Sequence, residues 1–104
     1  MAEYSFVLKK YFVASHIHNG EDIHGHNFYC IGEFELDKVE KVKKEFDKTL
    51  KLLDYRILNE IDFFKEKTPS TENIALFIYQ NLKDKIKVKK IEVFETVNFS
   101  GGVK

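Results

Sequence analysis

Cysteine and net charge are both scarce in this 104-residue chain, and each scarcity excludes a class of site. Cys30 is the only cysteine, so the chain has no internal disulfide and cannot build a thiolate metal cluster by itself. Any bound metal must therefore be held by histidine and carboxylate. The 17 basic and 17 acidic residues balance, so net charge gives no reason to expect a nucleic acid or an anionic membrane as a partner. The partner must be sought in a local site.

Long apolar runs, linkers and repeats are also missing. No apolar run approaches the roughly 20 residues of a membrane span, and the start, Met-Ala-Glu-Tyr, lacks the basic-then-apolar pattern of a signal peptide. We therefore expect a cytoplasmic protein with no membrane partner. Because there is no Pro/Gly-rich linker, residues 1–104 are expected to form one domain, small enough that assembly with copies of itself would bury useful surface.

Two stretches of the chain alternate apolar and polar residues with the period of a β-strand. They cover residues 4–16 and 24–36, and in both the even-numbered positions are largely apolar. Each stretch predicts a strand with one buried face, and histidines belong to that face. Asn19-Gly20, followed by Glu21, predicts a turn or short functional loop that joins the two strands as antiparallel neighbours.

The apolar spacing changes to three or four residues after Asp37, which predicts an amphipathic helix. Its apolar side carries Val39, Val42, Phe46, Leu50 and Leu53. A second helix is expected with Thr68 as N-cap and Pro69 at its first position. Its apolar side carries Ile74, Phe77, Ile78 and Leu82.

Strand-like alternation returns at Val88 and continues to Phe99, and a carboxylate, Glu95, lies in its apolar row. Residues 101–103 leave room only for a very short last strand. The order of elements predicts an α+β domain in which helices cover one face of an antiparallel sheet.

His24-Gly25-His26 is the pattern with the clearest chemical meaning. On a strand, both imidazoles project from one face about 7 Å apart at the backbone, a span that one metal ion can bridge. His16 ends the neighbouring strand on the corresponding face, although His18 shares its parity and competes as the third ligand. Three imidazoles without a thiolate leave the fourth zinc position open for substrate or water, as in catalytic sites. We therefore predict a catalytic Zn²⁺ held by His16, His24 and His26.

Four motifs in one order resemble the family of 6-pyruvoyltetrahydropterin and 6-carboxytetrahydropterin synthases. They are Phe12-Val13-Ala14-Ser15-His16 with His24-Gly25-His26-Asn27-Phe28, Leu53-Asp54-Tyr55 with Leu58-Asn59, Ser70-Thr71-Glu72-Asn73-Ile74-Ala75, and Phe94-Glu95-Thr96. The resemblance implies the T-fold, an antiparallel sheet in the order β-β-α-α-β-β with two helices on one face. It also implies subunits assembled into barrels, so the partners would be a pterin and further copies of the chain, as a trimer or hexamer.

The same resemblance assigns substrate-binding roles. Glu95, followed by Thr96, would hold the guanidine-like edge of the pterin, and a carboxylate suits two parallel N–H bonds. The alternative for Glu95 is a salt bridge to a nearby lysine. Ser70 and Thr71 match positions that contact the pterin from a neighbouring subunit, and helix capping is the alternative reading of both.

The chain departs from the usual enzymes of this family at the catalytic cysteine. No cysteine precedes the His-Gly-His motif, and Cys30 is better read as a small core residue than as a displaced nucleophile. Glu21, three residues before His24, instead resembles the variant branch in which glutamate replaces cysteine. The alternative for Glu21 is a solvated turn acid. Tyr55 stands where the family has the histidine of its Asp-His pair. The resemblance therefore does not carry over a proton relay through Asp54, whereas the Tyr55 phenol can donate a proton.

The resemblance implies a zinc-dependent lyase that cleaves the side chain of 7,8-dihydroneopterin triphosphate to 6-hydroxymethyl-7,8-dihydropterin in folate synthesis, with Glu21, Asp54 and Tyr55 as candidate catalytic residues. One alternative is a 6-carboxytetrahydropterin or 6-pyruvoyltetrahydropterin synthase-type reaction, against which the missing cysteine argues. The other is a non-catalytic T-fold protein that binds pterin or zinc.

Overall fold

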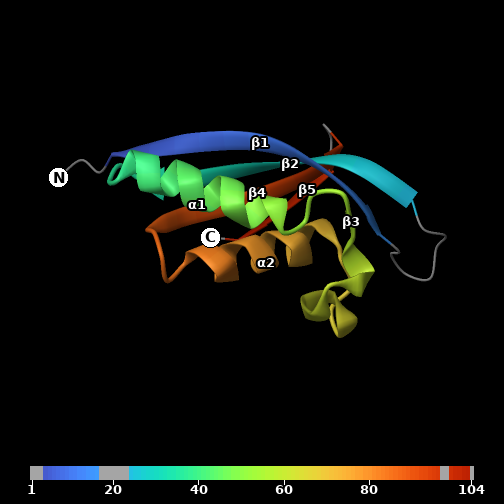
Figure 1. Ribbon diagram of the computed structural model, residues 1–104. Helices are drawn as coiled ribbons and strands as arrows, with labels where there is room; N and C mark the ends of the chain where they lie inside the picture. The colour runs from blue at the N-terminus through green and yellow to red at the C-terminus, as the bar shows by residue number, and fades with distance from the viewer. Residues whose placement is uncertain (1–3, 17–23, 97–98, 104) are drawn as a thin grey trace.

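The computed structural model describes residues 4–16, 24–96 and 99–103, and at residues 24, 26, 96, 99 and 100 it describes the backbone alone. Within these residues, one sheet has five strands in the order β3-β1-β2-β4-β5 (Figure 1). The strands are β1 (Ser5–His16), β2 (His24–Glu35), β3 (Arg56–Ile57), β4 (Val88–Thr96) and β5 (Phe99–Val103). The helices are α1 (Val39–Lys51) and α2 (Thr71–Leu82), and two 3₁₀ turns lie between them at Leu58–Glu60 and Asp62–Lys65.

The β1–β2 hairpin confirms the alternation that the sequence predicts. The two strands pair antiparallel without a break from Ser5 opposite Glu35 to His16 opposite His24. Phe12 lies opposite Phe28 and their rings stack with centroids 5.2 Å apart. Because opposite residues share a face, even-numbered positions of both strands form one face of the hairpin, and on it Phe12, Ala14, Phe28, Cys30 and Phe34 are buried.

Both helices cover this buried face of the sheet (Figure 1), as the α+β prediction requires. The apolar stripe of α1 packs toward β1 and α2, and α2 packs on β4 and β5. The core contributed by the helices consists of Val42, Phe46, Leu50, Ile74, Ala75, Phe77, Ile78 and Leu82. The opposite face of the sheet carries no helix among the described residues (Figure 1). No described helix is long and apolar enough to span a membrane.

One element was not foreseen from the sequence. The two-residue strand β3 pairs parallel with Ala14 and Ser15, which makes the sheet mixed at this edge while all other pairs are antiparallel. A strand this short has no detectable period, so alternation cannot predict it. It ties the segment after α1 to the end of β1 that carries His16.

The expected start of the second helix is wrong by two residues. Ser70, not Thr68, is the N-cap of α2: it has an extended backbone, and its Oγ accepts a hydrogen bond of 3.2 Å from the backbone N–H of Asn73. Pro69 therefore precedes the helix instead of beginning it. The Thr68 carbonyl accepts hydrogen bonds from the Ser70 N–H and from Asn73 Nδ2, so it belongs to the turn before the cap.

The C-terminal strands also differ from expectation. The alternating stretch ends at Thr96, and Phe99 starts β5, which runs back along β4 with Thr96 opposite Phe99. The last strand is five residues long instead of very short. Its glycines permit a close approach, because a Cβ on Gly101 would lie 2.6 Å from the backbone nitrogen of Glu72 in α2. Strand β5 therefore packs directly beneath the start of that helix.

Candidate functional site

His16 is held in a fixed orientation at the end of β1. The residue is 1% exposed, and its Nδ1 lies 2.7 Å from the carbonyl oxygen of Pro69, just before α2. Because a carbonyl can only accept, the ring donates through Nδ1, and its Nε2 carries the lone pair in the neutral form. A ring N–H donated to a backbone carbonyl is the arrangement that orients metal-binding histidines.

Glu95 lies beside this ring, on β4. Its Oε1 is 3.3 Å from His16 Nε2, and its side chain is 23% exposed, so the carboxylate reaches from the core toward solvent. Phe28 of β2, between the two strands, meets the His16 ring edge-on with centroids 5.4 Å apart. A lone pair and a carboxylate oxygen attract one another only when a proton or a cation lies between them. This corner of the sheet therefore suits a positively charged occupant.

The backbone places His24 and His26 at this same end of the sheet. His24 lies directly opposite His16, and His26 lies opposite Ala14, whose side chain is buried. Their side chains lie outside the described residues, as does the side chain of Thr96. Among the side chains that are described, no group of three or more His, Cys, Asp or Glu could hold a metal. The three-histidine zinc site therefore stays a prediction.

Glu21 and His18 fall within residues 17–23, which lie outside the described part of the chain. The strands on either side are placed, and they end with His16 and begin with His24, paired with each other. The connection that contains Glu21 therefore starts and finishes at the histidine end of the hairpin. The role of Glu21 therefore stays a prediction.

The start of α2 supports His16 from the helix side. Ser70 performs the capping role that the sequence left open as an alternative to pterin contact. Thr71 is buried, and a Cβ on Gly101 would lie 2.7 Å from its Oγ1. Sequence reasoning missed Pro69, whose contact with His16 uses a backbone carbonyl that every residue type has. A residue pattern carries no signal for such a contact.

Asp54 and Tyr55 are not brought to His16 within the chain. Asp54 Oδ1 accepts a hydrogen bond of 2.9 Å from the backbone N–H of Val13. Tyr55 is 81% exposed, and its backbone adopts a left-handed φ of 58°. It borders a shallow surface hollow of about 230 Å³ lined by Val13, Ala14, Ser15, Gly25, Arg56 and Ile57. Val13 and Ser15 have the opposite parity to His16, so this hollow lies on the other side of β1.

Cys30 is fully buried in the core cluster, as the sequence analysis expected. Burial disfavours the thiolate and raises the pKa of the Cys30 thiol far above its ordinary range. A thiol that stays protonated is a poor nucleophile and a poor metal ligand. Cys30 therefore cannot replace the cysteine that is missing before the His-Gly-His motif.

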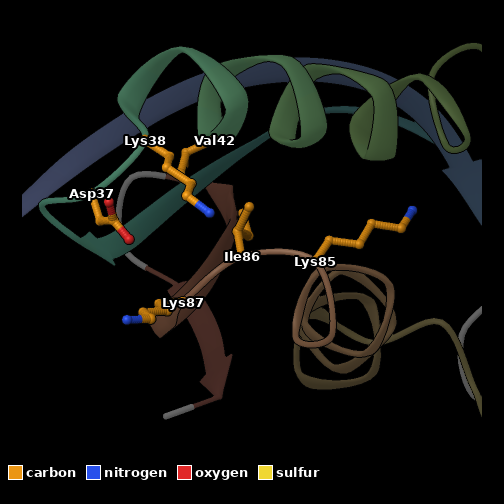
Figure 2. Close-up of a pocket in the computed structure, with 6 residues that line it drawn as sticks. All are labelled: Asp37, Lys38, Val42, Lys85, Ile86 and Lys87. Carbon is orange, nitrogen blue, oxygen red and sulfur yellow. The ribbon is translucent and has the colours of Figure 1, made fainter.

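A second hollow lies at the opposite end of the hairpin (Figure 2). Its volume of about 90 Å³ is well below the roughly 300–1,000 Å³ of small-molecule sites. It is lined by Asp37, Lys38, Val42, Lys85, Ile86 and Lys87. Figure 2 shows the amines of Lys85 and Lys87 extending away from it in opposite directions, so they do not converge on a ligand.

The order of elements and the histidine-bearing hairpin define a T-fold protein. The sequence model described as "6-pyruvoyl tetrahydropterin synthase" matches residues 3–101. The chain belongs to this family.

Individual relatives agree with this membership. The dihydroneopterin monophosphate aldolase of Pyrococcus furiosus is 35% identical over 89% of this chain and 90% of its own length. A putative 6-pyruvoyl tetrahydrobiopterin synthase of Caenorhabditis elegans is 31% identical over 62% of this chain and 54% of its own length. The structure of a Caenorhabditis elegans 6-pyruvoyl tetrahydropterin synthase superposes with a TM-score of 0.85 at 22% identity, covering 100% of this chain and 96% of that one. This superposition supports the fold.

Proposed function

We propose that this chain is a zinc-dependent lyase that cleaves the side chain of a phosphorylated 7,8-dihydroneopterin to give 6-hydroxymethyl-7,8-dihydropterin. The observation that carries the proposal is the similarity, over nearly the full length of both chains, to a dihydroneopterin monophosphate aldolase. Glu21, in place of the family's cysteine, points in the same direction. The family resemblance alone favours the triphosphate as substrate, whereas the name of this relative favours the monophosphate, which we place first.

The described part of the site fits zinc. The ring of His16 is buried, donates Nδ1–H to the Pro69 carbonyl and has its Nε2 3.3 Å from Oε1 of Glu95. The β1–β2 register adds two histidine positions next to it, His24 and His26. Zinc bound by these three residues would supply a Lewis acid that lowers the pKa of the substrate's side-chain hydroxyls.

Glu95 is the residue we assign to the pterin ring. A carboxylate accepts two parallel N–H bonds from the amino group and ring nitrogen of a pterin, and these charge-assisted bonds fix the plane of the ligand. The partial exposure of Glu95 leaves such an approach open. We assign Thr96 to the same end of the pterin. Ser70 and Thr71 we assign to holding the start of α2, because their described contacts are capping and packing.

The chemical step needs a base and an acid. We assign Glu21 as the base that takes the proton from the 2′-hydroxyl while the C1′–C2′ bond breaks. C2′ then leaves as the carbonyl of a phosphorylated aldehyde, and the electron pair of the broken bond passes into the conjugated C6–N5 double bond. An acid then returns a proton to C1′. The phenol of Tyr55 suits this role, and because it is exposed on the other side of β1 from His16, we assign it to the site of a neighbouring copy in a homo-oligomer.

A synthase-type reaction is the second candidate, yielding a 6-pyruvoyl or 6-carboxy tetrahydropterin. The family description and the putative synthase among the relatives favour it. The missing cysteine argues against it, because Cys30 is buried and burial raises the pKa of its thiol. A non-catalytic pterin-binding protein is the third candidate, favoured by the tyrosine at position 55.

Product analysis separates the three candidates. Zinc-loaded protein is incubated with dihydroneopterin monophosphate and, separately, with the triphosphate, and the pterin product is identified by mass. We expect the hydroxymethyl product, and a loss of kcat of about 10²–10⁴-fold in Glu21→Gln, the range for a general base. The neighbouring Asp22→Asn is the matched control and should retain activity. A pyruvoyl or carboxy product would support the second candidate, and tight pterin binding without turnover the third.

Elemental analysis tests the metal assignment independently. Wild-type protein should hold one zinc per chain, and His24→Ala should lose most of it. His18→Ala is the control and should keep a full complement. Full zinc in His24→Ala protein, or loss of zinc in His18→Ala, would contradict the ligand set.

A further inference from the structure

The segment that follows α1 is joined to β1 by an unusual pair of hydrogen bonds at one residue, Val13. The Val13 N–H donates to Asp54 Oδ1 at 2.9 Å, and the Val13 carbonyl accepts the Tyr55 N–H at 2.5 Å. Immediately beyond, Arg56 and Ile57 pair parallel with β1 as strand β3. The carboxylate of Asp54 therefore takes the place of a strand carbonyl and extends the sheet edge by one position.

This junction imposes a particular backbone on Tyr55. Its φ of 58° is in the left-handed region, which a bulky residue adopts only when its surroundings enforce it. Packing of the Tyr55 side chain does not enforce this φ, because the residue is 81% exposed. The position of the phenol is therefore set by the backbone bonds on either side, of which the Asp54–Val13 bond is one.

We propose that Asp54 is a positioning residue: its carboxylate clamps Val13 and thereby fixes the direction in which Tyr55 presents its phenol. Asp54 Oδ1 accepts a hydrogen bond from a backbone N–H, so we assign the carboxylate the role of an acceptor that holds the backbone, in place of a proton relay. The role of the phenol itself rests on the proposed lyase function. The clamp is a property of the fold and can be measured without turnover.

Amide hydrogen exchange tests the clamp itself. In Asp54→Ala the Val13 amide loses a hydrogen bond to a charged acceptor, so its exchange should accelerate about tenfold or more. In Asp54→Asn the side-chain carbonyl can accept the same bond, so exchange should stay close to wild type. Glu66→Ala, an exposed acid beyond the second 3₁₀ turn, is the control. Unchanged Val13 exchange in Asp54→Ala would overturn the clamp, whether or not the protein is a lyase.

A double-mutant cycle tests whether Asp54 acts through Tyr55. We expect Asp54→Ala to lower kcat at least tenfold, Asp54→Asn to restore it with an unchanged pH profile, and Asp54→Ala to cost less than threefold when Tyr55→Phe is already present. The positioning role would be overturned if Asp54→Asn were as inactive as Asp54→Ala. It would also be overturned if Asp54→Ala lowered kcat equally in wild-type and in Tyr55→Phe protein. Full activity of Tyr55→Phe would overturn it as well, although the lyase assignment would stand. If the wild-type protein has no lyase activity, the proposed function fails and Val13 exchange still decides the clamp.

Discussion

Gly101 offers a direct test of how closely β5 packs against the start of α2. A Cβ added there would lie 2.6 Å from the backbone nitrogen of Glu72 and 2.7 Å from Thr71 Oγ1. The backbone atom cannot rotate away, so either strand or helix must shift. Such overpacking typically costs about 1–3 kcal/mol, and each kcal/mol lowers Tm by about 4–8 °C in a domain of about 100 residues. Gly101→Ala should therefore melt several degrees below wild type.

Metal-free protein is the sample for this comparison, followed by circular dichroism during thermal and urea unfolding. Gly25→Ala is the matched control, because its Cβ would meet nothing nearer than the Ala14 carbonyl oxygen at 3.9 Å. Replacing a strand glycine in open space should leave stability unchanged or raise it by roughly 0.5–1 kcal/mol. Equal stability of the two variants would refute the close packing. A shift of α2 would also move the Pro69 carbonyl that orients His16, so on the zinc site that we propose, zinc affinity should fall in Gly101→Ala.

Three further predictions concern single residues. Ser70→Ala removes the cap that receives the Asn73 N–H, so unfolding by urea should show a loss of about 0.5–2 kcal/mol, most of which Ser70→Asn should recover. Hydrogen bonds from the side chains of Lys10 and Lys51 lower the pKa of Asp47 in the folded protein. The resulting stabilisation is therefore fully present at a pH above the pKa of Asp47 in the unfolded chain, and it is lost as the pH falls through the lower pKa of the folded state. Asp47→Asn should flatten the acid limb of the stability profile, and at pH 7 it should cost less than about 1 kcal/mol, because the pair is exposed to solvent. Cys30 should react with thiol reagents only as fast as the protein unfolds, and rapid labelling of native protein would contradict its burial.

The long periodic segments were the most predictable part of the fold. Alternation placed both strands of the hairpin and correctly assigned their buried face, because each strand has one face on the core. The three-to-four spacing likewise identified α1 and α2. The start of α2 was missed because Thr68 and Ser70 are both residue types that cap helices well, and in the structure it is Ser70 Oγ that accepts the Asn73 N–H.

The candidate site, too, was predicted in one part and missed in another. The sequence indicated a histidine at the end of β1 and a carboxylate in the apolar row of β4, and the structure brings His16 and Glu95 within 3.3 Å. The sequence analysis also placed Asp54 and Tyr55 in the site. That placement came from the family resemblance alone. In the fold, Tyr55 is exposed on the other side of β1 from His16.

The sequence by itself determined the β1–β2 hairpin, the two helices, the parity that places His16 on the buried face and the lack of a reactive cysteine. These follow from periodicity and residue type, which are local properties. Only the tertiary structure decided that His16 donates to the carbonyl of Pro69, 53 residues away, and that Asp54 accepts from Val13, 41 residues away. The reason is physical: one partner in each bond is a backbone group, identical in nearly every residue, so its choice is made by packing and leaves no mark in the sequence.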